Sequence, residues 1–290
     1  MLKLATTILI LASSLMAFAE CLTLQPSFQV GDTLRYRATA DVRMRHETDS
    51  MHSVTIMLPQ VYIESKNDKG YVILTSNSLE EFDIENSDPT GIEFMDYNSS
   101  MLNDIVSAIR LKVQLDENNR PDSIINMDEM KNNMLEAYQK LFEKQTGREL
   151  TTDPEWENDT KPLIAIAINA ICDKDHLLDE QFNNIAYFNL IGIPLKSEEI
   201  PSSLILTDEL QRLCPDLTTL SMEIQNIDNI EGCGTIDHKY HSIIVKGKNE
   251  NSNIYGKWLF TNGNLTQANL LVSTKSNSET ITGIYTIESL

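Results

Sequence analysis

Apolar side chains follow a two-residue period at both ends of this chain and a helical period in its middle, and this order restricts the fold more than any other feature. Over residues 33–45, apolar positions that begin with Leu34 and Tyr36 alternate with polar positions that include four arginines. Such alternation predicts a long strand with one buried face. A block of strands, then helices, then strands again is typical of the α+β class.

Two further strands are expected in the N-terminal block, which spans residues 28–83. The runs 54–63 and 71–79 are rich in β-branched and aromatic residues, and a polar turn ending at Gly70 joins them. Together with 33–45 they predict an antiparallel meander. Pro59 has no backbone N–H to donate, so it indicates an edge position or a bulge.

The middle of the chain, residues 95–215, is expected to be helical apart from one hairpin near 111–125. Apolar residues recur at helical spacing over 101–109 and again over 127–142, where the stripe stops at Thr146 and Gly147. Between them, 111–115 alternates and is followed by the turn-forming run 116–121. Helices are also expected at 176–188 and 203–213.

The segment Leu163–Cys172 is apolar on nearly every side. Thr160 is placed to cap a helix here, and Pro162 suits its first turn. A helix that is apolar all round is expected to be buried on most sides.

Five strands are expected in the C-terminal block, residues 217–290, and the Asn262–Gly263 pair predicts a tight hairpin between two of them. Neither strand block closes a core alone. We therefore expect one curved, half-barrel-like antiparallel sheet built from both blocks and covered by the central helical segment, within a single domain over residues 20–290. Two domains divided near residue 216 are the alternative. The expected strands are 220–230, 236–246, 254–260, 265–273 and 280–287.

Residues 1–19 have the layout of a signal peptide. Lys3 precedes an apolar run over 4–15, and Ala17-Phe18-Ala19 is a small-residue cleavage pattern. The run is too short for a membrane anchor, which needs about 20 residues. We predict cleavage near Ala19–Glu20 and secretion to the periplasm or cell envelope. Glu20 argues against lipidation of Cys21, and no later segment has the length and apolarity of a transmembrane helix.

The formal net charge of −20 opposes binding to nucleic acid, whose partners need clustered Lys and Arg. Four cysteines allow two disulfides in an oxidising compartment, with three possible pairings, and the alternative is that they are buried thiols. Their long, irregular spacing does not suit a zinc site. The cysteines are Cys21, Cys172, Cys214 and Cys233.

The chain carries no recognisable catalytic motif. Its five histidines lack metal-ligand spacing, and no nucleophile elbow or phosphate-binding glycine loop occurs. We therefore expect no catalytic residue, no metal and no cofactor. Paired carboxylates from distant strands leave a secreted hydrolase as an alternative, because an acidic chain offers many candidates.

Positive charge gathers on the strand over 33–45. If this face lined a cavity, its guanidinium groups would hold an anionic ligand through paired hydrogen bonds. The alternative is a solvent-facing surface on which arginines pair with neighbouring carboxylates. This arginine stripe consists of Arg35, Arg37, Arg43 and Arg45.

Three segments of the chain, 30–36, 115–121 and 256–265, resemble short sequence segments of uncharacterised secreted proteins of Bacteroidota. The overall layout is similar to periplasmic lipoprotein-carrier half-barrels, in which helices plug a curved antiparallel sheet. The helical middle here is much larger, and such an insertion fills the hollow that a carrier would use. The resemblance implies a fold and a compartment but no catalytic residue.

These features favour a non-enzymatic periplasmic or cell-envelope protein. Its expected partner is an apolar or amphiphilic small molecule or an envelope protein. A secreted hydrolase with dispersed acidic residues and a purely structural envelope component are the alternatives.

Overall fold

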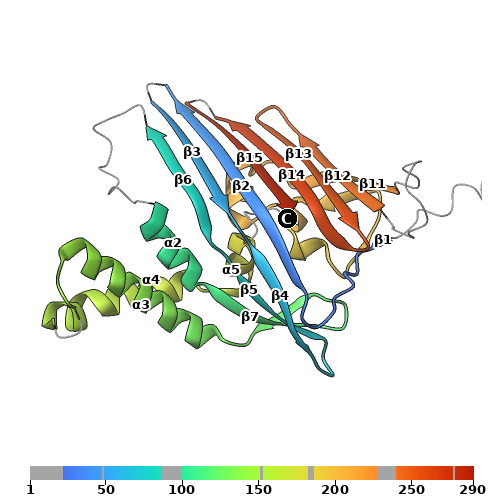
Figure 1. Ribbon diagram of the computed structural model, residues 1–290. Helices are drawn as coiled ribbons and strands as arrows, with labels where there is room; N and C mark the ends of the chain where they lie inside the picture. Colours follow the sequence, from blue (N-terminus) through green and yellow to red (C-terminus); the bar gives the residue numbers. More distant parts are fainter. Residues whose placement is uncertain are drawn as a thin grey trace, which may run out of the picture.

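The computed structural model describes residues 22–47, 49–86, 99–150, 153–181, 186–226, 240–276 and 278–290. A 13-stranded antiparallel sheet dominates it, running from β10 and β11 at one side to β6 and the β4–β5–β7–β8 branch at the other (Figure 1). β1 (Leu22–Thr23) and β9 (Pro194–Leu195) form a separate small sheet. The strands of the large sheet are β2 (Thr33–His46), β3 (Ser50–Met57), β4 (Gln60–Lys66), β5 (Tyr71–Ser76), β6 (Leu79–Asn86), β7 (Arg110–Leu115), β8 (Pro121–Ile124), β10 (Glu199–Pro201), β11 (Thr219–Asn226), β12 (Tyr240–Lys248), β13 (Ser252–Thr261), β14 (Asn264–Lys275) and β15 (Glu279–Ser289).

The N-terminal and C-terminal strand blocks meet in the centre of this sheet. β15 pairs with β2 from Glu279 opposite His46 to Ser289 opposite Tyr36. The prediction of one curved, open antiparallel sheet built from both strand blocks is confirmed. The alternative boundary near residue 216 falls between β10 and β11, which pair in the same sheet.

Pro59 divides what would otherwise be one long strand. β2 pairs with β3 along one half and with β4 along the other, and the break lies at Leu58 and Pro59. The Pro59 carbonyl still accepts a hydrogen bond from the Tyr36 N–H at 2.9 Å. Because proline has no backbone N–H to donate, the ladder of backbone hydrogen bonds is interrupted here. An irregularity of this kind was predicted at Pro59.

The hairpin between β13 and β14 has the turn that its sequence predicts. Asn262 and Gly263 both have positive φ, 52° and 79°, which suits a two-residue hairpin turn. A Cβ at Gly263 would lie 2.4 Å from the Gln25 carbonyl oxygen, so this turn also packs closely on the N-terminal segment.

The middle of the chain is more broken than its helical periodicity suggests. The expected helix over 203–213 is divided into a short 3₁₀ turn, η3, and α6, because only the second part has a capping threonine, Thr207. At 176–188 the structure has α5 followed, beyond residues that are not described, by the 3₁₀ turn η2. The helical elements are α2 (Ser99–Ala108), α3 (Met127–Thr146), η1 (Trp156–Thr160), α4 (Lys161–Ile171), α5 (Lys174–Gln181), η2 (Phe188–Leu190), η3 (Ser202–Leu204) and α6 (Asp208–Leu213).

One core joins the inner face of the sheet to this middle segment. Tyr36 and Trp258 of the sheet belong to the same buried cluster as Met130 of α3, Phe188 of η2 and Leu206. The side chains of the middle segment therefore cover the sheet, as expected.

The expected burial of α4 is wrong. Only Ile168 is fully buried, whereas Leu163 and Ile166 are 66% and 65% exposed. In Figure 1, α3 and α4 lie beside the lower left of the sheet. α4 packs against α3 on one side, and among the described residues its other side is exposed. Thr160 does not cap α4 either, because it belongs to η1, a π-helical turn that leads directly into the helix.

None of the helices within the described residues combines the length and apolarity needed to span a membrane. The predicted signal peptide and its cleavage site lie outside the described residues, and secretion stays a prediction.

Candidate functional site

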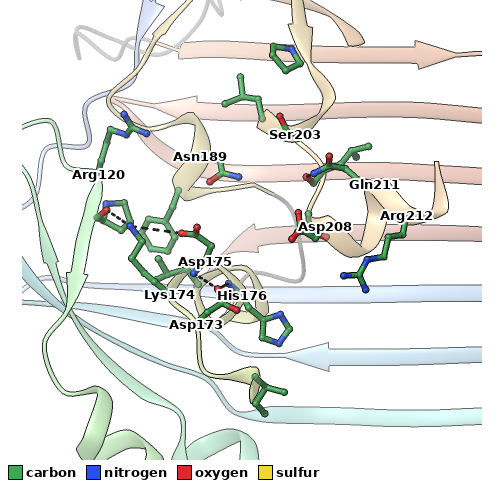
Figure 2. A pocket seen from close by; sticks show the side chains of 18 of the residues that line it. Arg120, Asp173, Lys174, Asp175, His176, Asn189, Ser203, Asp208, Gln211 and Arg212 are labelled. Carbon is green, nitrogen blue, oxygen red and sulfur yellow. Dashed lines mark hydrogen bonds and ion pairs between the residues drawn. The ribbon is translucent and has the colours of Figure 1, made fainter. Parts of the chain in front are cut away.

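A pocket with a volume of about 920 Å³ lies among the helical elements. Its walls come from the end of α4, the start of α5, η2, η3 and α6 (Figure 2). The large sheet contributes only Pro121 at the start of β8 and Pro201 at the end of β10. We call this cavity the α4 pocket.

One side of the α4 pocket carries two basic side chains, Arg120 and Lys174, next to the carboxylates of Asp173 and Asp175. Arg120 ends the turn before β8, where its backbone N–H donates to Asp116 Oδ1 at 2.8 Å. Gly192 leaves room for the Arg120 side chain, because a Cβ on this glycine would lie 2.7 Å from Arg120 Cγ. Lys174 Nζ donates to the Pro121 carbonyl at 3.3 Å and lies 3.9 Å from Asp175 Oδ1.

Asp173 is held in place by the first turn of α5. Its Oδ1 accepts hydrogen bonds from the backbone N–H groups of Asp175, at 3.1 Å, and His176, at 3.0 Å. This is the contact of a helix-capping residue. Asp173 therefore fixes the start of α5 and positions His176 on the pocket wall.

The opposite wall is formed by α6. Leu210 N–H donates to the Thr207 side chain at 3.4 Å, which caps the helix. Gln211 Nε2 donates to the Leu206 carbonyl at 2.9 Å. Asp208 and Arg212 follow on the same helix, and Figure 2 shows them on the other side of the pocket from Arg120 and Lys174.

The floor of the pocket connects to the sheet through aromatic rings. Phe188 lines the pocket, and its ring lies 4.9 Å from that of the buried Tyr187 in an edge-to-face contact. The Tyr187 ring lies 6.1 Å from that of Tyr36 in β2. Burial raises the pKa of Tyr187 to about 12 and raises that of Tyr36, so both phenols stay neutral at physiological pH.

An exposed apolar surface leads out of the α4 pocket. Ala170 and Ile171 line the pocket, and Leu163, Ile166 and Ala167 continue on the same side of α4. The spacing of these five residues, i, i+3, i+4, i+7 and i+8, places them on one helical face. We call this face the α4 stripe. A folded soluble protein would ordinarily direct such a face towards its core.

A second, smaller pocket of about 300 Å³ lies between α3 and α4. Lys131 Nζ of α3 donates to Asn169 Oδ1 of α4 at 2.7 Å across it. This contact joins α4 to α3 on the side away from the α4 stripe, since Ile168 also lines this groove.

The arginine stripe lies elsewhere. All four arginines are exposed and lie on the opposite face of β2 from the buried Tyr36 and Ala38. Arg37 Nε contacts Glu80 Oε2 at 2.9 Å, and Arg43 Nε contacts Asp41 Oδ1 at 3.3 Å. These contacts match the alternative interpretation, in which the stripe is a solvent face paired with carboxylates. None of the four lines either pocket, and a ligand role for them stays a prediction.

Cys172 and Cys214 are buried free thiols. Burial raises the pKa of both, which disfavours the reactive thiolate. Cys21 and Cys233 lie outside the described residues, so their pairing stays a prediction.

Sequence reasoning did not find the α4 pocket. Arg120 and Arg212 had no motif to mark them, since one ends a turn and the other lies in the last turn of a short helix. The apolarity of α4 was a usable signal, but it was interpreted as burial.

Comparisons with known proteins give no match to a protein family and none to a curated protein. Among solved structures, the chain is similar to one titled "Lipid-protein interactions in lipovitellin", with a TM-score of 0.40 and 9% identity. The similarity covers 91% of this chain and 25% of that one, so this chain spans about a quarter of that structure's length.

Proposed function

We propose that this chain is a secreted cell-envelope protein that binds an amphiphilic small molecule without converting it. The polar part of the ligand lies in the α4 pocket, and its apolar part lies along the α4 stripe. The observation that carries this proposal is the continuity of the two surfaces, because Ala170 and Ile171 belong to both.

The exposed α4 stripe supplies the driving force. Full burial of a Leu or Ile side chain is worth about 1.5–3 kcal/mol. Leu163 and Ile166 are about two-thirds exposed, so covering each would recover about 1–2 kcal/mol. An alkyl chain that lies on the α4 stripe would bury these side chains, and the free energy of that burial would favour binding.

The α4 pocket supplies polar contacts and sufficient space. Its volume lies at the upper end of the range of ligand sites, about 300–1,000 Å³. Three basic and three acidic side chains line it, in a chain whose net charge is −20. The pocket is therefore balanced in charge and offers both donors and acceptors to a polar head group.

The core argues against a ligand held between the sheet and its cover. Trp258 and Phe260 are 0% and 1% exposed on the inner face, where they pack with residues of the middle segment. A ligand site on the helices suits a chain whose enlarged middle segment occupies the half-barrel.

The hydrolase alternative needs a carboxylic acid shielded from water, because burial is what keeps a general acid protonated at neutral pH. In the α4 pocket, Asp175 is 89% exposed at its side chain and Asp208 is exposed. Asp173 already accepts two backbone hydrogen bonds. These carboxylates suit polar contacts with a ligand better than acid catalysis.

Binding of the neutral fluorescent probe N-phenyl-1-naphthylamine to residues 20–290 tests the proposal. The variant Ile166→Gln removes a central side chain of the α4 stripe, and we expect a dissociation constant about tenfold higher, which corresponds to about 1.4 kcal/mol. Ile284→Gln is the matched control, because Ile284 is 43% exposed on the sheet. Equal probe binding by both variants and the unaltered chain would refute the assignment of the site.

Native mass spectrometry of the protein purified gently from its own envelope gives a second test. Release of a small amphiphile on mild denaturation is the expected result. A bare protein mass, together with failure of the probe to bind, would favour a structural role.

A further inference from the structure

The α4 pocket carries basic and acidic side chains in equal number. They are Arg120, Lys174 and Arg212, and Asp173, Asp175 and Asp208. At physiological salt the Debye length is about 8 Å, so a ligand in the pocket responds mainly to these side chains and less to the net charge of the whole chain. A head group that carries only one sign of charge therefore meets as many repelling side chains as attracting ones.

On the wall next to α4, positive charge is more available to a ligand than negative charge. Asp173 Oδ1 already accepts from two backbone N–H groups, those of Asp175 and His176. The Asp175 side chain is 89% exposed, so water screens its charge. The Lys174 side chain is only 39% exposed, and its Nζ donates to the Pro121 carbonyl at 3.3 Å. An ammonium group has three donors, so Lys174 can donate to a ligand as well.

Arg120 is the second basic residue of this wall, and its backbone is fixed. Its N–H donates to Asp116 Oδ1 and its carbonyl accepts from the Asp116 N–H, both at 2.8 Å. The stem of its side chain passes close to Gly192, where a Cβ would lie 2.7 Å from Arg120 Cγ. A guanidinium group has a planar fork of donors, which suits a phosphate or carboxylate group.

The wall across the pocket belongs to α6, where Asp208 provides the negative charge. Asp208 is the first residue of this helix, directly after the capping Thr207. Figure 2 shows Asp208 on the other side of the pocket from Arg120 and Lys174. A cationic group bound at this wall would therefore lie across the pocket from an anionic group bound at the first.

The α4 stripe determines which charge of a ligand lies next to its alkyl chain. Ile171 belongs to both the stripe and the pocket, and only two residues separate it from Lys174. An alkyl chain on the stripe therefore enters the pocket at the wall of Lys174 and Arg120. The distal part of the head group then reaches α6, where it meets Asp208.

We propose that the ligand of the α4 pocket is a zwitterionic amphiphile with its anionic group next to the alkyl chain and its cationic group at the distal end. The anionic group binds Lys174 and Arg120, and the cationic group binds Asp208, through charge-assisted contacts. This inference rests on the proposed function, because it takes the alkyl chain to lie on the α4 stripe.

Displacement of N-phenyl-1-naphthylamine from residues 20–290 by dodecyl amphiphiles tests the head group, with each competitor kept below its critical micelle concentration. Dodecylphosphocholine has the proposed order of charges, and dodecyl sulfobetaine has the reverse order. Dodecyl phosphate and dodecyltrimethylammonium carry one charge each, and dodecyl maltoside carries none. We expect dodecylphosphocholine to bind at least about fivefold more tightly than each of the other four.

Two substitutions should shift the selectivity in opposite directions. Arg120→Gln and Asp208→Asn should each weaken binding of dodecylphosphocholine about three- to tenfold. Arg120→Gln should also weaken dodecyl phosphate relative to dodecyltrimethylammonium, and Asp208→Asn should do the reverse. Arg148→Gln and Asp83→Asn are matched controls that should change nothing, because both residues are exposed and line neither pocket. General unfolding of a variant would weaken all competitors together and cannot produce opposite shifts.

The outcomes separate this inference from the proposed function. If no dodecyl amphiphile displaces the probe, both fail. If all five displace it equally, or if one other than dodecylphosphocholine binds most tightly, the site binds alkyl chains but the charge assignment is overturned. Shifts in the same direction for Arg120→Gln and Asp208→Asn would overturn it too. Free phosphocholine should compete at least about tenfold less well, and equal competition would assign the pocket to a soluble zwitterion, against the proposal.

Discussion

Strand β13 and helix α4 are both rich in large apolar residues, yet they occupy opposite environments. In β13, Ile254, Trp258 and Phe260 are at most 1% exposed, because neighbouring strands flank them and the middle segment covers them. In α4, Ile168 alone reaches that environment, and the α4 stripe faces outwards. An apolar segment gains free energy when it is buried. Whether the folded chain buries it depends on the helices and strands that surround it. Under the proposed function, an amphiphilic ligand covers the α4 stripe.

The largest expected difference between β13 and α4 is the loss in the free energy of unfolding when an apolar side chain is shortened. Trp258→Ala removes a fully buried ring and should destabilise the protein by about 3–5 kcal/mol. Denaturant titration followed by circular dichroism measures this loss. A cost below about 1 kcal/mol would mean that the sheet core is loosely packed and would remove the contrast with α4.

The buried tyrosines make the free energy of unfolding dependent on pH. Burial raises the pKa of Tyr187 to about 12, and burial followed by proximity to Tyr187 raises that of Tyr36. An unfolded tyrosine ionises near pH 10, so above that pH the unfolded state loses its proton first. The contribution of Tyr187 is complete below about pH 10 and falls as the pH rises towards about 12, by up to about 1.4 kcal/mol per pH unit. The contribution of Tyr36 is also complete below about pH 10 and falls above it.

Urea unfolding at several pH values between 8 and 11 checks this expectation. Tyr187→Phe should show a smaller loss of stability between pH 10 and 11 than the unaltered chain. Tyr62→Phe, which alters a tyrosine that is 39% exposed, is the control and should retain the full loss. Identical pH profiles for all three proteins would contradict the role assigned to burial.

The fold was predictable where one short-range pattern decides the outcome. Alternation over 33–45 specifies a strand, and Asn262–Gly263 specifies the hairpin between β13 and β14, because both depend on neighbouring residues alone. The exposure of α4 depends instead on where α3 and the sheet end in space. The sequence of α4 itself does not indicate those positions. The α4 pocket was unpredictable for the same reason, since Arg120, Lys174 and Arg212 come from elements that meet only in the folded chain.

Helix capping illustrates the limit of local patterns at two threonines. Thr207 has extended backbone geometry and accepts from Leu210 N–H, whereas Thr160 is helical and makes no capping hydrogen bond. We expect Thr207→Ala to cost about 1 kcal/mol and Thr160→Ala to cost much less. Thermal unfolding of the two variants measures the difference. An equal loss would show that Thr160 caps α4 in solution, as its sequence position suggests.

The smallest expected effect on stability belongs to the α4 stripe itself. Ile166→Gln alters an apolar side chain that is 65% exposed, so the free energy of unfolding should change by no more than about 0.5 kcal/mol. Urea unfolding without any added amphiphile measures this value. Little change in stability combined with weaker probe binding would mean that the residue serves a ligand and contributes little to the fold. A loss of 2 kcal/mol or more, comparable to about half of the Trp258→Ala effect, would place Ile166 in the core and remove the basis for the proposed site.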